Sequence, residues 1–246
     1  MNAVLIGYGD IGKSLYEVLS PYHKISITDM ATDRVAEGTF DILLIAIPFS
    51  PVFVPFVEHY QRQYTGKGRT RIPTLIFSTV AIGISDICAA YHSPIEGRHT
   101  KIVDMIRRQT YCIGKKKDSA MDENLFIATF FEEAKLKYDF FDNAKITEFL
   151  KLRSTALFGV NIEFARYSKQ VADDIGMDFE LVKEYDKAHN RLCREVGMDY
   201  CQRYILDPPE GEIKGHCVVP NSIILDEQYP SVFLKEIYRP KGNKII

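Results

Sequence analysis

The sequence predicts an α/β fold, in which a doubly wound parallel sheet of the Rossmann type is followed by an all-helical domain built on one long helix. Three observations predict it. The chain opens with an apolar run, residues 4–6, then glycines at the spacing G-x-G-x-x-G and the start of a helical pattern. Short apolar runs then alternate with helical patterns, which is typical of a parallel sheet covered on both faces. From residue 144 onward the apolar period is helical only.

Apolar runs and helical periods predict the elements of the first half. The strands expected after residues 4–6 lie at 25–28, 40–47 (ending at Pro48), 74–78, 111–114 and 136–141. Helices are expected to start at Leu15 and to cover residues 54–64, 84–91 and 122–134. The glycine-containing basic stretch at 66–69 is interpreted as a solvated turn, because no strand–turn–helix context surrounds it.

The second half is expected to be helical. Asp142 and Asn143 are N-cap candidates for a helix over residues 144–175, which Gly176 ends. Asp178 can cap a second helix that runs to residue 197, and a shorter one is expected at 200–206. We therefore expect two domains, an NAD-binding domain at 1–142 and a substrate and dimerisation domain at 143–246. The first helix is too long for a surface element of so small a domain, which favours a homodimer through it.

The glycine motif indicates dinucleotide binding. Gly7 makes the tight turn, Gly9 lets the backbone approach a pyrophosphate, and Gly12 lets the helix pack closely on its strand. Asp29 follows about twenty residues later, at the end of the second strand, where a carboxylate can accept hydrogen bonds from ribose hydroxyls. A carboxylate there would repel a 2′-phosphate, and Arg34 is the only nearby cation, so NAD is favoured over NADP.

Composition limits the possible partners and the compartment. The net charge is −2, so no global basic field attracts nucleic acid or an anionic membrane. The longest apolar stretch, 42–57, is broken by prolines and is shorter than the ~20 residues that span a bilayer. The N-terminus enters a strand at once, which argues against a signal peptide. Five cysteines without a C-x-x-C pair predict reduced thiols in a cytoplasmic protein and no zinc site.

Cys217 differs from the other four thiols, three of which fall in expected helices. It lies between Gly215 and Pro220 in an expected loop, next to His216, where a thiol is placed to be reactive. The alternative is a buried loop thiol without a role.

Three further segments carry a resemblance to a known family. They are residues 45–48 (I-A-I-P), 78–85 (S-T-V-A-I-G-I-S) and 215–220 (G-H-C-V-V-P). With the glycine turn in front of them, their order resembles the UDP-glucose/GDP-mannose dehydrogenase family, the nucleotide-sugar 6-dehydrogenases. Its S-T-V-x-x-G-T-T turn is similar to residues 78–85. Its G-G-x-C box is similar to residues 214–217, with Lys214 in place of the first glycine.

The resemblance implies an oxidation of a primary alcohol in two steps with two NAD. The intermediates would be held on Cys217 as a thiohemiacetal and then a thioester. Lys151 matches the family's helix lysine, which stabilises developing oxyanions, and Thr155 stands where the family has asparagine. Asn221 stands where the family has aspartate, and an amide cannot act as a general base. The cofactor-binding residues expected from the glycine motif and the resemblance are Gly7, Tyr8, Gly9, Asp10, Ile11, Gly12, Asp29, Ile47, Pro48, Ser78 and Thr79.

Two features leave other functions open. Family members carry a further C-terminal domain that grips the nucleotide half of the substrate, so the resemblance implies a smaller substrate or a partner that supplies that surface. Residues 92–99 are similar to the H-P-M-x-G segment of prephenate dehydrogenases, which makes His92 a candidate for proton transfer and His99 a solvated loop residue. The alternatives are therefore a single-step dehydrogenase of the prephenate or hydroxyacid type using His92, a non-catalytic NAD(H)-binding module, and an interaction protein.

Overall fold

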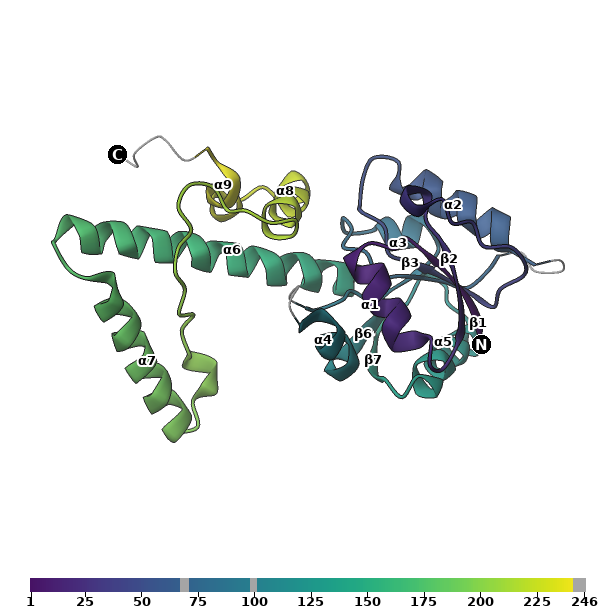
Figure 1. The fold of residues 1–246 in the computed structure, drawn as a ribbon, viewed down its shortest axis with the longest axis horizontal. Coiled ribbons are helices and arrows are strands. Elements are labelled where there is room, and N and C mark those ends of the chain that lie inside the picture. Colours follow the sequence, from purple (N-terminus) through teal and green to yellow (C-terminus); the bar gives the residue numbers. More distant parts are fainter. Residues whose placement is uncertain (67–70, 98–100, 241–246) are drawn as a thin grey trace. The chain divides into compact units, whose positions relative to one another are not determined.

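The computed structural model describes residues 1–66, 71–97 and 101–240 (Figure 1). The chain forms two compact units, an N-terminal unit, Met1–Lys151, and a C-terminal unit, Leu152–Ile246. The division falls inside the long helix. The prediction that 1–142 and 143–246 are functional domains stays a prediction.

The N-terminal unit is built on a seven-stranded sheet in the order β2-β1-β3-β4-β5-β6-β7. Its strands are β1 Asn2–Ile6, β2 Lys24–Thr28, β3 Ile42–Ile45, β4 Thr74–Ile76, β5 Tyr91–His92, β6 Thr110–Gly114 and β7 Lys137–Phe141. Its helices are α1 Asp10–Leu19, α2 Phe53–Tyr64, α3 Ile84–Ile87, α4 Ile102–Arg108 and α5 Met121–Glu133, with a short 3-10 helix η1 at Met30–Thr32. The predicted doubly wound α/β class is confirmed.

Alternation along the strands divides the apolar core between the two faces of the sheet. Ala3 and Leu5 of β1 pack with α1, α4 and α5, whereas Val4 and Ile6 pack with α2 and α3. Figure 1 shows these two sets of helices on opposite sides of the sheet. Both faces are therefore covered, which is why the inner strand β3 is apolar and buried at every position.

The order of the strands places a topological switch point beside β1. The chain passes from β1 to β2 on one side and then to β3 on the other. Ile6, Ile45 and Ile76 lie in register on β1, β3 and β4, so these parallel strands end at the same edge. In doubly wound sheets, ligands bind outside the carboxyl ends of the strands at such a point.

The sequence missed three features of this unit. The sheet is not wholly parallel, because β5 pairs with β6 in the antiparallel direction at His92 and Gly114. The helix expected at 84–91 is wrong beyond Ile87, since Tyr91 and His92 form β5. Two residues are too few for a period to identify a strand. Helix α4 was not expected at all.

In its described part, the C-terminal unit contains helices and no strand. The elements are α6 Ala144–Asp174 (whose first residues belong to the N-terminal unit), α7 Phe179–Glu195, α8 Val218–Gln228 and α9 Val232–Tyr238. The predicted caps are present, because Asn143 Oδ1 accepts from the Ile146 N–H at 3.2 Å and Asp178 Oδ1 from the Glu180 N–H at 3.0 Å. Gly176 leaves α6 with φ +70°, as a left-handed helix end requires.

Two expectations for this unit are wrong. Only one 3-10 turn, η3 at Asp199–Cys201, forms where a helix was expected at 200–206. Residues 218–220 are not loop but the first turn of α8, so Cys217 occupies the N-cap position of a helix. In the described ranges, no helix is both long and apolar enough to cross a membrane.

Candidate functional site

The glycine turn lies at the carboxyl end of β1, beside the switch point. A Cβ added at Gly7, which has φ +95°, would lie 2.4 Å from the Ala46 carbonyl oxygen. One added at Gly12 would lie 2.1 Å from the Gly7 carbonyl oxygen. Both positions are too close for any side chain, so the turn, α1 and the end of β3 pack directly against one another. A Cβ added at Gly9 would meet nothing within 4 Å, so the space in front of this residue is open.

Asp29 directly follows β2 and is hydrogen-bonded to this turn. Its Oδ2 accepts from the Tyr8 N–H at 2.7 Å, and its Oδ1 accepts from the Thr32 N–H and hydroxyl at 2.9 Å each. Partial burial acts to raise the pKa of Asp29, but these hydrogen bonds outweigh it and hold the pKa below its usual value. The carboxylate is therefore ionised at neutral pH and fixed beside the glycine turn.

Arg34 lies at the same place, although no binding role was predicted for it. Its backbone pairs with Asp29 through two hydrogen bonds of 2.8 and 3.0 Å. Its guanidinium lies over the Tyr8 ring, 4.8 Å from the ring centroid. A sequence pattern cannot show this stacking, because it depends on the turn of η1 that reverses the chain after Asp29.

The other predicted cofactor residues follow the carboxyl ends of β3 and β4. Ile47 is half-buried and Pro48 is exposed after β3, and Thr79 is half-buried after β4. The Ser78 hydroxyl is buried and has no hydrogen-bond partner within the described residues. Asp10 and Ile11 begin α1 behind Gly9. These residues share one edge of the sheet, although their binding roles stay predictions.

His92 is buried completely at the end of β5. Its Nδ1 lies 2.8 Å from the Thr147 hydroxyl and its Nε2 3.1 Å from the Ser78 carbonyl oxygen. A neutral ring satisfies both contacts when Nε2–H donates to Ser78 and Nδ1 accepts from Thr147. Burial lowers the pKa of His92 to about 4. With both ring nitrogens bonded inside the protein, this geometry favours a structural link over proton transfer.

The buried neutral state of His92 predicts a pH dependence of stability. Between pH about 6.5 and 4 the unfolded chain binds a proton at this residue and the folded chain does not. The free energy of unfolding should therefore fall as the pH falls through this window, by up to about 3 kcal/mol from His92. Urea denaturation across the window should show a smaller fall for His92→Gln than for the wild type. His59→Gln, which changes an exposed histidine, should keep the wild-type dependence, and an equal fall in all three proteins would contradict the assignment.

Lys151 lies on α6 at the end of the N-terminal unit. Its Nζ donates to the Ile95 carbonyl oxygen at 2.7 Å and lies 3.4 Å from Glu96 Oε2, and its side chain is 12% exposed. The ammonium is therefore held beside the loop that follows β5. The role in oxyanion stabilisation stays a prediction.

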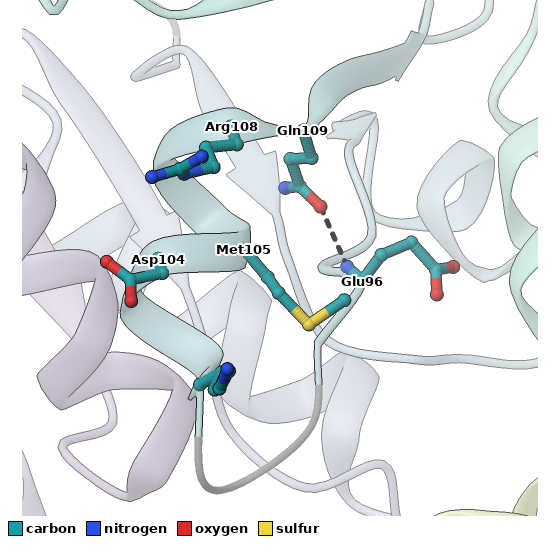
Figure 2. Close-up of a pocket in the computed structure, with 6 residues that line it drawn as sticks. Glu96, Asp104, Met105, Arg108 and Gln109 are labelled. Carbon is teal, nitrogen blue, oxygen red and sulfur yellow. Dashed lines mark hydrogen bonds between the residues drawn. The ribbon is translucent and has the colours of Figure 1, made fainter.

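Glu96 also borders a pocket of about 540 Å³ beside α4 (Figure 2). Gln109 Oε1 accepts from the Glu96 N–H at 2.9 Å across it, while the Glu96 carboxylate points away from α4. The pocket is lined by Glu96, Lys101, Asp104, Met105, Arg108 and Gln109. None of these is a predicted cofactor residue. Acidic and basic side chains both line this pocket, so its charge does not indicate one class of ligand.

The C-terminal unit brings three of the predicted catalytic positions close in its fold. The Asn221 amide donates to the Thr155 hydroxyl at 3.2 Å, and the Asn221 N–H donates to the Cys217 carbonyl oxygen at 3.0 Å. Cys217 is exposed at the N-cap of α8, so the alternative of a buried loop thiol is wrong. A Cβ added at Gly159 would lie 2.8 Å from Val218, which shows how closely α6 packs on the start of α8.

Some of the residues singled out in the sequence lie outside the part of the chain that the structure describes. Residues 67–69 of the predicted basic turn and His99 lie outside the described residues. The five cysteines are all free, and Cys88 and Cys193 are buried as expected for small apolar side chains.

Two residues of α6 belong to the site region but were not expected from the sequence. Thr147 bonds His92, and the buried Glu148 accepts from the Gly83 N–H at 2.6 Å and the Ser85 N–H at 2.8 Å. Within an amphipathic helix pattern a threonine and a glutamate are typical of the solvent face. In the sequence, only their position near the polar N-terminus of the helix could have indicated a role for them.

Solved structures share the fold of this chain. No protein-family model and no curated protein matches the sequence. Among solved structures, a UDP-D-ManNAc dehydrogenase from Pyrococcus horikoshii matches 97% of this chain with a TM-score of 0.73 at 15% identity. A UDP-glucose dehydrogenase from Pyrobaculum islandicum matches 96% with the same TM-score and identity. In each case this chain spans 66% of the other, slightly less than two thirds.

A third structure is covered more completely. The 3-hydroxyisobutyrate dehydrogenase from Mycobacterium tuberculosis matches 96% of this chain and 90% of its own, with a TM-score of 0.66 at 10% identity. The predicted resemblance to nucleotide-sugar dehydrogenases is thus confirmed at the level of the fold. At these identities, the function has to be argued from the residues of the site.

Proposed function

We propose that this protein binds NAD and oxidises an alcohol group of a sugar or nucleotide-sugar-like substrate. The observation that carries the proposal is the glycine turn at the β1/β3 switch point, with open space at Gly9 and the ionised Asp29 beside it. The fold shared with sugar and hydroxyacid dehydrogenases supports it.

The residues of the N-terminal unit fit a dinucleotide. The N–H groups that start α1 behind Gly9 would hold the diphosphate, and Asp29 would accept from ribose hydroxyls. The guanidinium of Arg34 on Tyr8 would offer a flat surface to the adenine. The Ser78 hydroxyl, buried without a partner, would meet the nicotinamide end. The bound cofactor would accept hydride from the alcohol carbon.

The protein's own residues would supply the remaining chemistry. Lys151 would stabilise negative charge that develops on the substrate oxygen. In a double oxidation the Cys217 thiol would add to the aldehyde formed first, giving a thiohemiacetal. Transfer of a hydride from the thiohemiacetal carbon to a second NAD, bound in exchange for the NADH formed first, would give a thioester, and water would then release the acid and restore the thiol. Cys217 is suited to this role, because its side chain is exposed at the start of α8, where a substrate can reach it.

Asn221 bears on the last of these steps. Its amide is engaged with Thr155 and cannot take a proton from water. We therefore expect hydrolysis of a thioester to be slower than its formation in this protein. The alternatives remain a single oxidation without the thiol and an NAD(H)-binding module without turnover.

Counting NADH in the presence of limiting substrate tests the proposal. NAD would be incubated with UDP-glucose, UDP-N-acetylmannosamine and simple sugar alcohols, and NADH would be measured by absorbance. Two NADH per substrate would establish the double oxidation. One would favour the single-step alternative. No NADH, with binding of NADH shown separately by its fluorescence, would leave the non-catalytic module.

We further propose that the protein forms a homodimer through α6. Exposed apolar side chains recur on this helix seven or eight residues apart, at Phe149, Leu157, Phe164 and Val171. This spacing produces one stripe along the helix, which suits packing against the same helix of a second copy.

Phe164→Glu places a charge in this stripe and should shift the protein towards the monomer in sedimentation velocity. Phe164 is 66% exposed, so the folded monomer should tolerate the change. Leu181→Glu, at a comparably exposed position on α7, is the control and should keep the dimer. A monomeric wild type would rule out the proposal.

A further inference from the structure

Glu148 is a carboxylate that the structure buries completely and ties to one turn. It lies on α6 within the N-terminal unit and is 0% exposed. Its Oε2 accepts from the Gly83 N–H at 2.6 Å and its Oε1 from the Ser85 N–H at 2.8 Å. Burial raises its pKa above the usual value, and the hydrogen bonds from the turn oppose that rise. A buried carboxylate is costly to a fold, so what it holds in place is informative.

The turn that Glu148 holds is the one that carries Ser78 and Thr79. It follows the carboxyl end of β4 and leads into α3, whose N-cap is Gly83 with φ +98°. At its start, the Ser78 carbonyl oxygen lies 3.1 Å from the buried His92. At its end, Glu148 binds the two N–H groups that open α3. The turn is thus held at both ends.

Both attachments depend on consecutive residues of α6. Thr147 bonds the His92 ring, and Glu148 bonds Gly83 and Ser85 directly. These contacts join residues that are 55 to 65 positions apart in the sequence. A local cap, such as a serine or aspartate in the turn itself, would satisfy the same N–H groups at less desolvation. A carboxylate on α6 also fixes the position of the turn relative to the edge of the sheet, which a local cap does not do.

We propose that Glu148 is a positioning residue, which holds the turn of residues 78–85 in the conformation that receives the nicotinamide half of the cofactor. The inference rests on the proposed function, because it presupposes a bound dinucleotide. Glu148 itself touches only the protein, and it acts through Gly83 and Ser85.

The two halves of the dinucleotide provide the test. The ADP half is assigned to the glycine turn and Asp29, which follow β1 and β2 on the far side of β3 from β4, so ADP-ribose reports on that half alone. In Glu148→Gln an NH₂ group replaces one accepting oxygen and faces a backbone N–H. The variant should bind NADH about tenfold more weakly than the wild type, whereas its affinity for ADP-ribose should stay within about twofold. Isothermal titration calorimetry measures both affinities without any turnover.

A second variant approaches the same contact from the turn. Gly83→Ala meets no close neighbour, the nearest atom being 3.9 Å away, but strains the backbone at its positive φ. It should give the same selective loss of NADH affinity, and it carries the test if Glu148→Gln does not fold. Tyr91→Phe is the control. It removes the 2.8 Å hydrogen bond from the Tyr91 hydroxyl to Asn124, in the same unit. Tyr91 packs in the core on the side of the sheet covered by α1, α4 and α5. It should leave both affinities unchanged.

The outcomes separate the two proposals. A selective loss of NADH affinity in both variants supports the positioning role. An equal loss of both affinities would mean that Glu148 only stabilises the fold, and no loss would mean that the turn does not need it. Either result overturns the inference while the wild type still binds both nucleotides. A wild type that binds neither nucleotide would overturn the proposed function, and the inference with it.

Discussion

Substituting Gly12 by alanine should destabilise the N-terminal unit by about 3 kcal/mol and remove measurable NADH binding. The new Cβ would lie 2.1 Å from the Gly7 carbonyl oxygen and 2.9 Å from its carbon, which are backbone atoms of the glycine turn. Neither a rotamer change nor a small side-chain shift relieves that contact. Helix α1 would have to move away from the turn, and the N–H groups proposed to hold the diphosphate would move with it.

Gly9→Ala is the matched comparison, because the same methyl group enters open space there. The Gly9 backbone is extended with φ −73°, so alanine fits without strain. Because Gly9 is the N-cap of α1, where alanine is less favourable than glycine, the variant's free energy of unfolding should fall by no more than about 1 kcal/mol. NADH affinity should nevertheless fall by at least about tenfold, since the methyl group would stand where the diphosphate approaches. Chemical denaturation and NADH fluorescence titration measure the two effects. Unchanged NADH affinity in Gly9→Ala would contradict the assignment of this space to the cofactor.

Substituting Cys217 by serine should slow the second oxidation by at least about a thousandfold if the thiol forms the covalent intermediate, so that NADH formation stops at one per substrate. A serine hydroxyl is far less acidic than a thiol and is a poor nucleophile without a base. The fold should be unaffected, because Cys217 is exposed at the N-cap of α8 and serine is a preferred N-cap residue. NADH affinity should also be unchanged, since the cofactor residues belong to the N-terminal unit.

Cys201→Ser provides the matched control. Cys201 is a half-buried thiol of the same unit, and no role is predicted for it. It should keep wild-type turnover. Intact-mass measurement after incubation with NAD and an active substrate adds a direct readout. Because Asn221 cannot act as a base, the wild type should carry an acyl adduct that Cys217→Ser lacks. Full turnover in Cys217→Ser would exclude the thiol route and favour a single oxidation.

Local sequence signals predicted the conformation of the glycine turn and of several helix ends well. Gly12 meets Gly7 of the same turn, and Asp29 follows β2 directly. The caps at Asn143 and Asp178 and the helix end at Gly176 are equally local. Such features depend on the conformation of a few neighbouring residues, which residue type and spacing constrain directly.

Features that arise between distant segments were missed. β5 is two residues long, and its antiparallel partner β6 lies beyond α4, so no periodicity marks it. Helix α8 was hidden because Cys217 and Pro220 read as loop, although proline is well tolerated in the first turn of a helix. His92 looked like a catalytic histidine from its sequence neighbours. Its burial and its two hydrogen bonds come from Thr147 and Ser78, which the sequence does not place beside it.

The attachment of the first turns of α6 also bears on how the chain can be synthesised and folded. A chain that ended at Asp142 would contain every strand of the sheet but would lack Thr147, Glu148 and Lys151. The His92 ring, the N–H groups that open α3 and the Ile95 carbonyl would lose these partners. Each buried polar group left unpaired costs about 1–3 kcal/mol. The sheet therefore reaches its final stability only once residue 151 has left the ribosome, so that its completion is coupled to the start of the unit that follows.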